Sequence, residues 1–149
     1  MRIAVIADTH GTFPPVLIEE LRAADEIWHL GDFCDLSTLN TLQKIGPEYR
    51  AVLGNNDYGL DLPLCLRLHR GGKSFTLIHI PPTRIGEADF LLHGHTHVPR
   101  DEKIGKTRIL NPGTAGKPNK GAPASWAWLD VNETTGEVTW TLNRLPSRR

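Results

Sequence analysis

Residues 2–7 read R-I-A-V-I-A, and residues 8–11, which follow at once, read D-T-H-G. A short, continuous apolar run that is rich in β-branched residues is typical of a strand buried on both faces. The polar residues after the run mark the loop at its carboxyl end. We therefore predict that the chain opens with a buried strand whose end carries a carboxylate and an imidazole.

The same arrangement recurs twice in the first third of the chain. Residues 26–30 and 50–53 are further apolar runs, each followed directly by glycine and a polar residue. In residues 15–24 and 36–45, which lie between the runs, apolar side chains recur at helical spacing. The order strand, helix, strand, helix, strand predicts a parallel sheet with right-handed crossovers.

The second half of the chain is richer in strands. Further strands are predicted at residues 64–68, 74–78, 90–92, 107–110, 126–131 and 138–142. The last two flank a loop that ends in Gly136, which is typical of a hairpin. We therefore predict an α/β fold, a four-layer α/β/β/α sandwich of two mixed sheets, that forms one domain over residues 1–149.

Length and charge limit the functional classes. A chain of 149 residues suits one domain with a full core. Lysine plus arginine and aspartate plus glutamate both number 17, so there is no global basic field and nucleic acid is not an expected partner. The first residues lack the pattern of a signal peptide, and no apolar run approaches membrane-spanning length. We expect a cytoplasmic protein with no membrane segment.

Seven side chains of the kinds that bind metals follow the apolar runs. They come from five separate segments: Asp8 and His10, Asp32, Asn55, His79, and His95 with His97. A parallel α/β sheet gathers the carboxyl ends of its strands at one edge, where such sheets bind ligands. Seven nitrogen and oxygen donors exceed the needs of one tetrahedral zinc ion and suit two ions that share a carboxylate. The sequence therefore predicts a dinuclear metal hydrolase.

The spacing of these residues supports the prediction only when they are taken together. Asp8 and His10 are two residues apart, so at the end of a strand they point the same way. Asp32 offers two oxygens and can bridge two cations. A single D-x-H is common by chance, and an isolated buried histidine is more often a core residue than a ligand. Five such segments, each after an apolar run, favour the metal site strongly.

At these positions the chain resembles the calcineurin-like metallophosphoesterases, most closely their small bacterial and archaeal phosphodiesterases. The matching segments are D-T-H-G at 8–11, G-D at 31–32, G-N-N-D at 54–57, His79, G-H-T-H at 94–97 and N-P-G-T at 111–114. The resemblance runs from Arg2 to about Leu142 and implies two metal ions. One would be held by Asp8, His10, Asp32 and His97, and the other by Asp32, Asn55, His79 and His95. Manganese is the first expectation, with iron, zinc, nickel or cobalt as alternatives.

Two features depart from the family pattern. Asn56 stands where the larger phosphatases carry a general-acid histidine, and it can donate a hydrogen bond to a phosphoryl oxygen but cannot deliver a proton. Ile80-Pro81-Pro82 follows His79 where relatives have a glycine, and the segment before Gly94 is short. In relatives this segment walls the substrate site. Its shortness predicts a more open site entrance, or one that a second copy of the chain completes in a homo-oligomer.

The resemblance implies a metal-dependent phosphoesterase, with a phosphodiester preferred among small phosphoester substrates. A hydroxide that bridges the two metals would attack phosphorus, and Asn55, Asn56 and His95 would donate hydrogen bonds to the phosphoryl oxygens. A non-catalytic metal-binding scaffold for protein interactions is the alternative on the same fold. The complete ligand set favours the enzyme, and the altered segment after His79 favours the scaffold. A nuclease of the same superfamily is disfavoured by length and charge.

Overall fold

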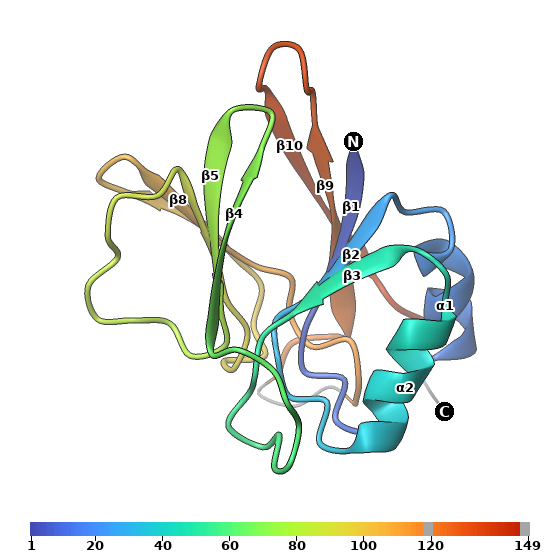
Figure 1. Ribbon diagram of the computed structural model, residues 1–149. Helices are drawn as coiled ribbons and strands as arrows, with labels where there is room; N and C mark the ends of the chain where they lie inside the picture. Colours follow the sequence, from blue (N-terminus) through green and yellow to red (C-terminus); the bar gives the residue numbers. More distant parts are fainter. Residues whose placement is uncertain (118–120, 147–149) are drawn as a thin grey trace.

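Two five-stranded sheets face each other in the computed structural model, which describes residues 1–117 and 121–146 (Figure 1). The first sheet has the strand order β10-β9-β1-β2-β3. Its strands are β1 (Arg2–Ile6), β2 (Glu26–His29), β3 (Glu48–Ala51), β9 (Ser125–Val131) and β10 (Val138–Arg144). Strands β1, β2 and β3 are parallel, as predicted, and β9 joins β1 in the antiparallel direction.

The second sheet has the strand order β4-β5-β6-β8-β7. Its strands are β4 (Cys65–Arg70), β5 (Lys73–Ile78), β6 (Phe90–Leu92), β7 (Arg100–Ile104) and β8 (Thr107–Asn111). Strands β5, β6 and β8 are parallel, and the antiparallel strands β4 and β7 form the two edges. The predicted sandwich of two mixed sheets is therefore confirmed.

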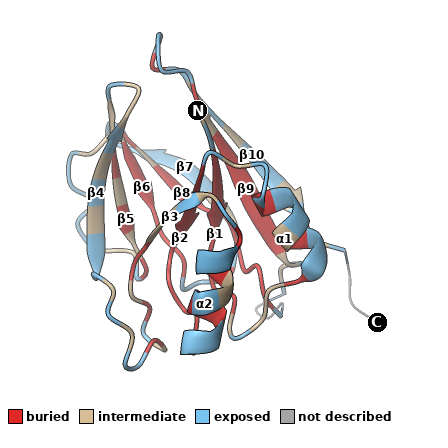
Figure 2. Ribbon diagram, turned by 45° about the vertical axis from the view of Figure 1, so that its right-hand side comes forward, coloured by how far each residue is buried: buried red, intermediate tan, exposed pale blue. Residues whose placement is uncertain are grey.

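Both helices lie against the outer face of the first sheet (Figures 1 and 2). Helix α1 spans Pro15–Leu21, and helix α2 spans Leu36–Lys44 and begins after Asp35, whose side chain accepts a hydrogen bond from the Thr38 N–H at 2.8 Å. No helix of the described residues covers the outer face of the second sheet, so the second helical layer of the predicted α/β/β/α order is not found there. Neither α1 nor α2 is long and apolar enough to cross a membrane.

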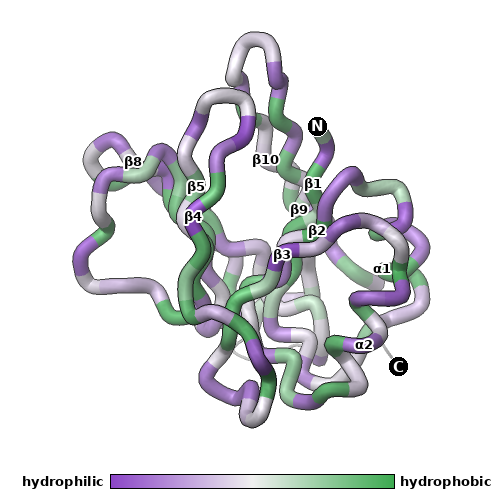
Figure 3. The backbone as a smooth tube through the Cα atoms, viewed as in Figure 1, coloured by the Kyte–Doolittle hydropathy of each residue, from purple (hydrophilic) through white to green (hydrophobic). Residues whose placement is uncertain are grey.

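The continuous apolar run at residues 2–7 is explained by its two neighbours. Ile3 and Val5 of β1 point into the cluster between the sheets, whereas Ala4 and Ile6 point into the cluster beneath the helices. All four side chains are fully buried. Because both faces of β1 are covered, the strand shows no polar alternation. Figure 3 shows β1 as a mainly hydrophobic segment.

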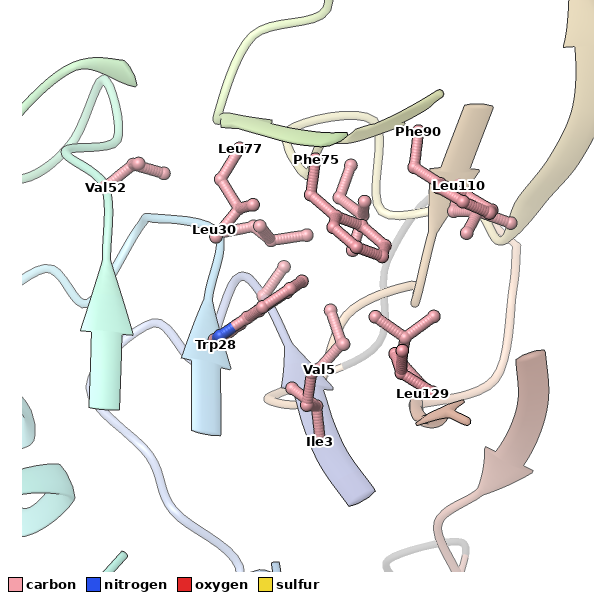
Figure 4. Close-up of a cluster of buried hydrophobic side chains, with 13 residues drawn as sticks. Ile3, Val5, Trp28, Leu30, Val52, Phe75, Leu77, Phe90, Leu110 and Leu129 are labelled. Carbon is pink, nitrogen blue, oxygen red and sulfur yellow. The ribbon is translucent and has the colours of Figure 1, made fainter. Parts of the chain in front are cut away.

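Aliphatic side chains and three aromatic ones fill the space between the sheets (Figure 4). Trp28 from the first sheet meets Phe75 from the second edge to face, with ring centroids 5.3 Å apart. Phe75 also stacks on Phe90 at 4.8 Å. Such pairs add to the hydrophobic stabilisation from burial itself. The two sheets are thus held at a fixed spacing, which in turn fixes the loops at their ends.

Strand β7 was not predicted from the sequence. Its residues, Arg100–Ile104, read R-D-E-K-I, and four of the five are exposed at the edge of the sheet. The strand has no apolar face, and its existence depends on hydrogen bonds to β8. Sequence patterns report burial, so an exposed edge strand carries no such signal.

A buried ion pair links the two sheets away from the site loops. Glu26 of β2 accepts hydrogen bonds from Arg70 of β4 at 2.9 and 3.0 Å and from the Trp28 indole at 2.9 Å. Only 6% of the Glu26 side chain and 18% of the Arg70 side chain are exposed. Burial raises the pKa of Glu26, but the Arg70 and Trp28 donors outweigh it and hold the pKa below its ordinary value.

We expect Glu26→Ala to lower the free energy of unfolding by about 3 kcal/mol at pH 7, because it leaves Arg70 without its partner. Glu48→Ala, which removes an exposed partner 3.9 Å from Arg50, should change it by less than about 0.5 kcal/mol. Since the folded pKa of Glu26 is depressed, its contribution is present above about pH 4.5 and is lost as the pH falls through the folded value. Urea titrations from pH 7 to pH 3 should show the Glu26 difference shrinking; a constant difference would contradict this account.

Candidate metal centre

All seven predicted ligand side chains follow strands that end at the same edge of the sandwich (Figure 1, below the sheets). Asp8 and His10 follow β1, Asp32 follows β2, Asn55 follows β3, His79 follows β5, and His95 and His97 follow β6. The first sheet supplies three of these loops and the second sheet two. The interface between the sheets therefore brings together segments that are as many as 89 residues apart, from Asp8 to His97.

Four of the side chains form a compact group, which we call the first ligand set: Asp8, His10, Asp32 and His97. One ligand atom from each lies within 4.8 Å of all the others. The Nε2 atoms of His10 and His97 face each other at 3.2 Å, and Asp32 Oδ2 lies 3.5 Å from His10 Nε2. Asp8, Asp32 and His97 are buried, so the group opens to solvent mainly past His10.

A second ligand set shares Asp32 and adds Asn55, His79 and His95. Asn55 Oδ1 lies 2.9 Å from His79 Nε2 and 3.2 Å from His95 Nδ1. His79 Nε2 lies 3.4 Å from Asp32 Oδ1. Asp32 therefore turns one carboxylate oxygen toward each set.

The arrangement around Asp8 fits a bound cation. Asp8 Oδ1 is buried and has no hydrogen-bond partner among the described residues. The Nε2 atoms of His97, His10 and His79 nevertheless lie 3.5, 3.7 and 3.9 Å from it. Several imidazole nitrogens that converge on a buried carboxylate oxygen are the chemistry of a metal site. The mixture of nitrogen and oxygen donors suits borderline divalent ions.

The site loops hold unusual backbone conformations. In the described chain, positive φ angles outside glycine occur at Asp8 (55°), His10 (48°), Asp32 (65°), Cys34 (76°), His95 (74°) and His97 (64°). Such conformations cost free energy and persist only where the surroundings impose them. Five of the six residues are predicted metal ligands, which places the strain at the site itself.

Electrostatics keeps the shared carboxylate charged. Burial raises the pKa of Asp32, but His79 and the hydrogen bonds from Asn56 outweigh it and hold the pKa well below its usual range. The Asp8 carboxylate is the main cause that raises the pKa of His10. An anionic Asp32 among imidazoles is a group prepared to receive positive charge.

Asn56 lies beside Asp32. Its backbone N–H donates to Asp32 Oδ1 at 3.0 Å, and its side-chain amide donates to Asp32 Oδ2 at 2.9 Å. The amide carries a second hydrogen, so the contact with Asp32 leaves a donor for a phosphoryl oxygen.

Asp57 has a structural role that the sequence did not reveal. Its buried carboxylate accepts hydrogen bonds from the backbone N–H groups of Asp32 at 2.9 Å, Cys34 at 2.8 Å and Gly54 at 2.8 Å. It therefore clamps the loop after β2 to the loop after β3. Asp57 is the last residue of the G-N-N-D motif at 54–57, and its place in that motif was the signal that the sequence offered.

Gly54 allows the same two loops to touch. A Cβ atom on Gly54 would lie 2.2 Å from both the backbone nitrogen and Oδ1 of Asp32. No side chain can be accommodated there without moving the shared carboxylate. The glycine before Asn55 is thus required by close approach.

Two further side chains connect the loops after β1 and β2. Cys34 Sγ lies 3.3 Å from His10 Nδ1, and burial together with neighbouring carboxylates raises the pKa of this thiol to about 11. His29 accepts a hydrogen bond from the Gly31 N–H on Nδ1, so its Nε2–H donates to Thr9 Oγ1, each at 3.0 Å. Cys34 is therefore a neutral neighbour of the predicted ligand His10, and His29 links the loop after β1 to the loop after β2.

The N-P-G-T turn after β8 supports the remaining loops. Thr114 Oγ1 donates to the Asp8 carbonyl at 2.9 Å, and the Asn111 amide donates to Thr96 Oγ1 at 2.9 Å. These hydrogen bonds connect the turn to the loop that carries Asp8 and to the loop that carries His95 and His97. The turn thus supports two of the site loops.

Comparison of the sequence with known protein families identifies the family of this chain. Residues 1–134 match the calcineurin-like phosphoesterase superfamily domain. A probable metallophosphoesterase of Methanothermobacter thermautotrophicus is 29% identical over 143 residues, which cover 83% of this chain and 83% of that protein. The phosphodiesterase YfcE of Escherichia coli is 41% identical over 46 residues, a match that covers 31% of this chain and 25% of YfcE.

Solved structures share the fold. Vps29 of Entamoeba histolytica, crystallised in complex with zinc, superposes with a TM-score of 0.76 over 97% of this chain and 99% of that chain. Sequence identity is 22%, so the likeness concerns the fold alone.

We expect Asp57→Asn to lower the free energy of unfolding by about 2–3 kcal/mol, because the new amide group would face a backbone N–H that loses its acceptor. Asp61→Asn, at an exposed position, should change it by less than about 0.5 kcal/mol. Denaturant unfolding of the two metal-free variants measures the difference. Equal stability of Asp57→Asn and wild type would show that the clamp is not needed.

Proposed function

We propose that this chain, which belongs to the calcineurin-like phosphoesterase superfamily, hydrolyses a small phosphodiester with the help of two divalent ions. The observation that supports this most directly is the position of Asp32, with one oxygen toward His10 and the other toward His79. A carboxylate so placed can serve two ions at once. The family match supports a metal-dependent phosphoesterase, and the local similarity to YfcE supports a diester.

The ligand sets assign the residues to the two ions. Asp8, His10, Asp32 and His97 would hold one, and Asp32, Asn55, His79 and His95 the other. When bound, such ions lower the pKa of a shared water toward neutrality and offset the charge on phosphoryl oxygens. Manganese is our first choice, and iron, zinc, nickel and cobalt suit the same donors.

Exposed donors at the mouth would orient the phosphoryl group. Asn55 and His95 are both exposed, so a substrate can reach them. The Asn55 Oδ1 atom faces the imidazoles, which leaves its amide hydrogens for a phosphoryl oxygen. The second amide hydrogen of Asn56 can add a further bond. Donors fixed before the substrate binds stabilise charge that develops in the transition state.

The identity of residue 56 favours a particular kind of substrate. Asn56 cannot protonate a leaving group, so the chain has no general acid at position 56. Departure of the alcohol would then depend on a good leaving group or on a proton from water. Diesters of acidic alcohols meet this requirement better than unactivated monoesters.

A metal-binding scaffold for protein interactions is the second candidate. Ile80, directly after the ligand His79, is 48% exposed at the short segment that precedes Gly94. An exposed aliphatic side chain beside the mouth suits a protein partner, including a second copy of this chain. The complete set of ligand side chains favours the enzyme over this alternative.

We expect metal-stripped protein to hydrolyse bis-p-nitrophenyl phosphate only after manganese is added, and faster than p-nitrophenyl phosphate. Asp32→Asn should reduce kcat/KM by about 1,000-fold, because it removes the charge shared by both sets. Asp61→Asn is the matched control and should keep wild-type activity. Circular dichroism checks that both variants fold. Wild-type protein that binds metal and hydrolyses neither ester with any of the five metals would favour the scaffold.

A further inference from the structure

We propose that Asn56 is a positioning residue that fixes the plane of the Asp32 carboxylate, so that each oxygen faces one ligand set. This inference rests on the proposed function, because it assumes that both sets receive an ion. It assigns to Asn56 a task distinct from contact with the substrate. The task is carried out through Asp32.

The first argument is that one residue holds both oxygens. The Asn56 backbone N–H donates to Oδ1 at 3.0 Å, and its side-chain amide donates to Oδ2 at 2.9 Å. The terminal torsion of an aspartate is broad, so an untethered carboxylate samples many orientations. Two donors from one rigid segment remove that freedom.

The second argument is the direction of the remaining lone pairs. Each carboxylate oxygen has two. With one lone pair of each oxygen engaged by Asn56, one is left to face His79 Nε2 at 3.4 Å from Oδ1 and one to face His10 Nε2 at 3.5 Å from Oδ2. The hydrogen bonds therefore divide the carboxylate evenly between the two sets. Loss of the amide would release Oδ2, the oxygen on the side of the first ligand set.

The third argument is that Asp57 and Gly54, which lie beside Asp32, do not hold its carboxylate. Asp57 accepts a hydrogen bond from the Asp32 N–H at 2.9 Å and so fixes the main chain. Gly54 approaches Asp32 closely but has no side chain to hold the carboxylate. Among the described residues, the amide of Asn56 is the side-chain group that hydrogen-bonds to Oδ2. Its removal keeps the backbone hydrogen bond from Asn56 to Oδ1 and releases Oδ2, so the carboxylate can turn about the oxygen that is still held.

Manganese binding to the metal-free full-length protein tests the inference, by isothermal titration calorimetry and by electron paramagnetic resonance of the loaded protein. We expect Asn56→Ala and Asn56→Leu, which removes the donor but keeps the volume, to bind manganese about 10–100-fold more weakly than wild type. The resonance signature of two coupled ions should also weaken. Asn40→Ala, at an exposed position of α2, should match wild type in both measurements.

The outcomes separate the two proposals. If either folded Asn56 variant binds two manganese ions with wild-type affinity and coupling, the positioning role is overturned while the function stands. If the variants lose affinity but wild-type protein hydrolyses no phosphoester, the function fails and the positioning role stands. Wild-type protein that binds no divalent ion overturns both. Thermal unfolding without metal checks that at least one Asn56 variant is folded.

Discussion

The buried carboxylates of Asp8 and Asp32 are the constraint on which the site depends. Both are almost inaccessible to solvent and stand among imidazole nitrogens between the two sheets. Burying negative charge is costly unless hydrogen bonds or cations compensate it. Asp32 receives hydrogen bonds from Asn56, whereas Asp8 Oδ1 receives none among the described residues. The fold therefore buries negative charge that hydrogen bonds compensate only in part. Divalent cations bound between the two carboxylates would supply the missing positive charge.

Hydrogen bonds between the site loops hold the two carboxylates in place despite the strained backbone of these loops. The Asp8 N–H donates to the Gly31 carbonyl at 2.9 Å and the His10 N–H to the Asp32 carbonyl at 3.0 Å, so the loops after β1 and β2 support each other. Asp57 and Gly54 join the loop after β3 to the same group. The aromatic core between the sheets sets the distance to His79 and His97, which come from the second sheet. The packing of the core therefore determines how the predicted ligands of the two sheets are placed relative to one another.

Sequence patterns predicted most of the fold because they report burial. The doubly covered run at residues 2–7 and the glycine-polar pairs after the next two strands were enough to place the parallel sheet and the edge at which ligands gather. Strand β7 was missed because its charged residues lie at an exposed edge. The hydrogen bonds that Asn56 donates to Asp32 and that the Cys34 N–H donates to Asp57 could not be predicted either, since they join segments more than 20 residues apart. Residue types and order identify candidate ligands, whereas their orientation depends on tertiary contacts.

We propose that two ions share Asp32 at the edge of the sandwich. Anomalous diffraction from crystals of manganese-loaded protein, recorded at the manganese absorption edge, tests this most directly. We expect two anomalous peaks on either side of Asp32, one beside Asp8, His10 and His97 and one beside Asn55, His79 and His95. A single peak, or peaks away from these residues, would contradict it.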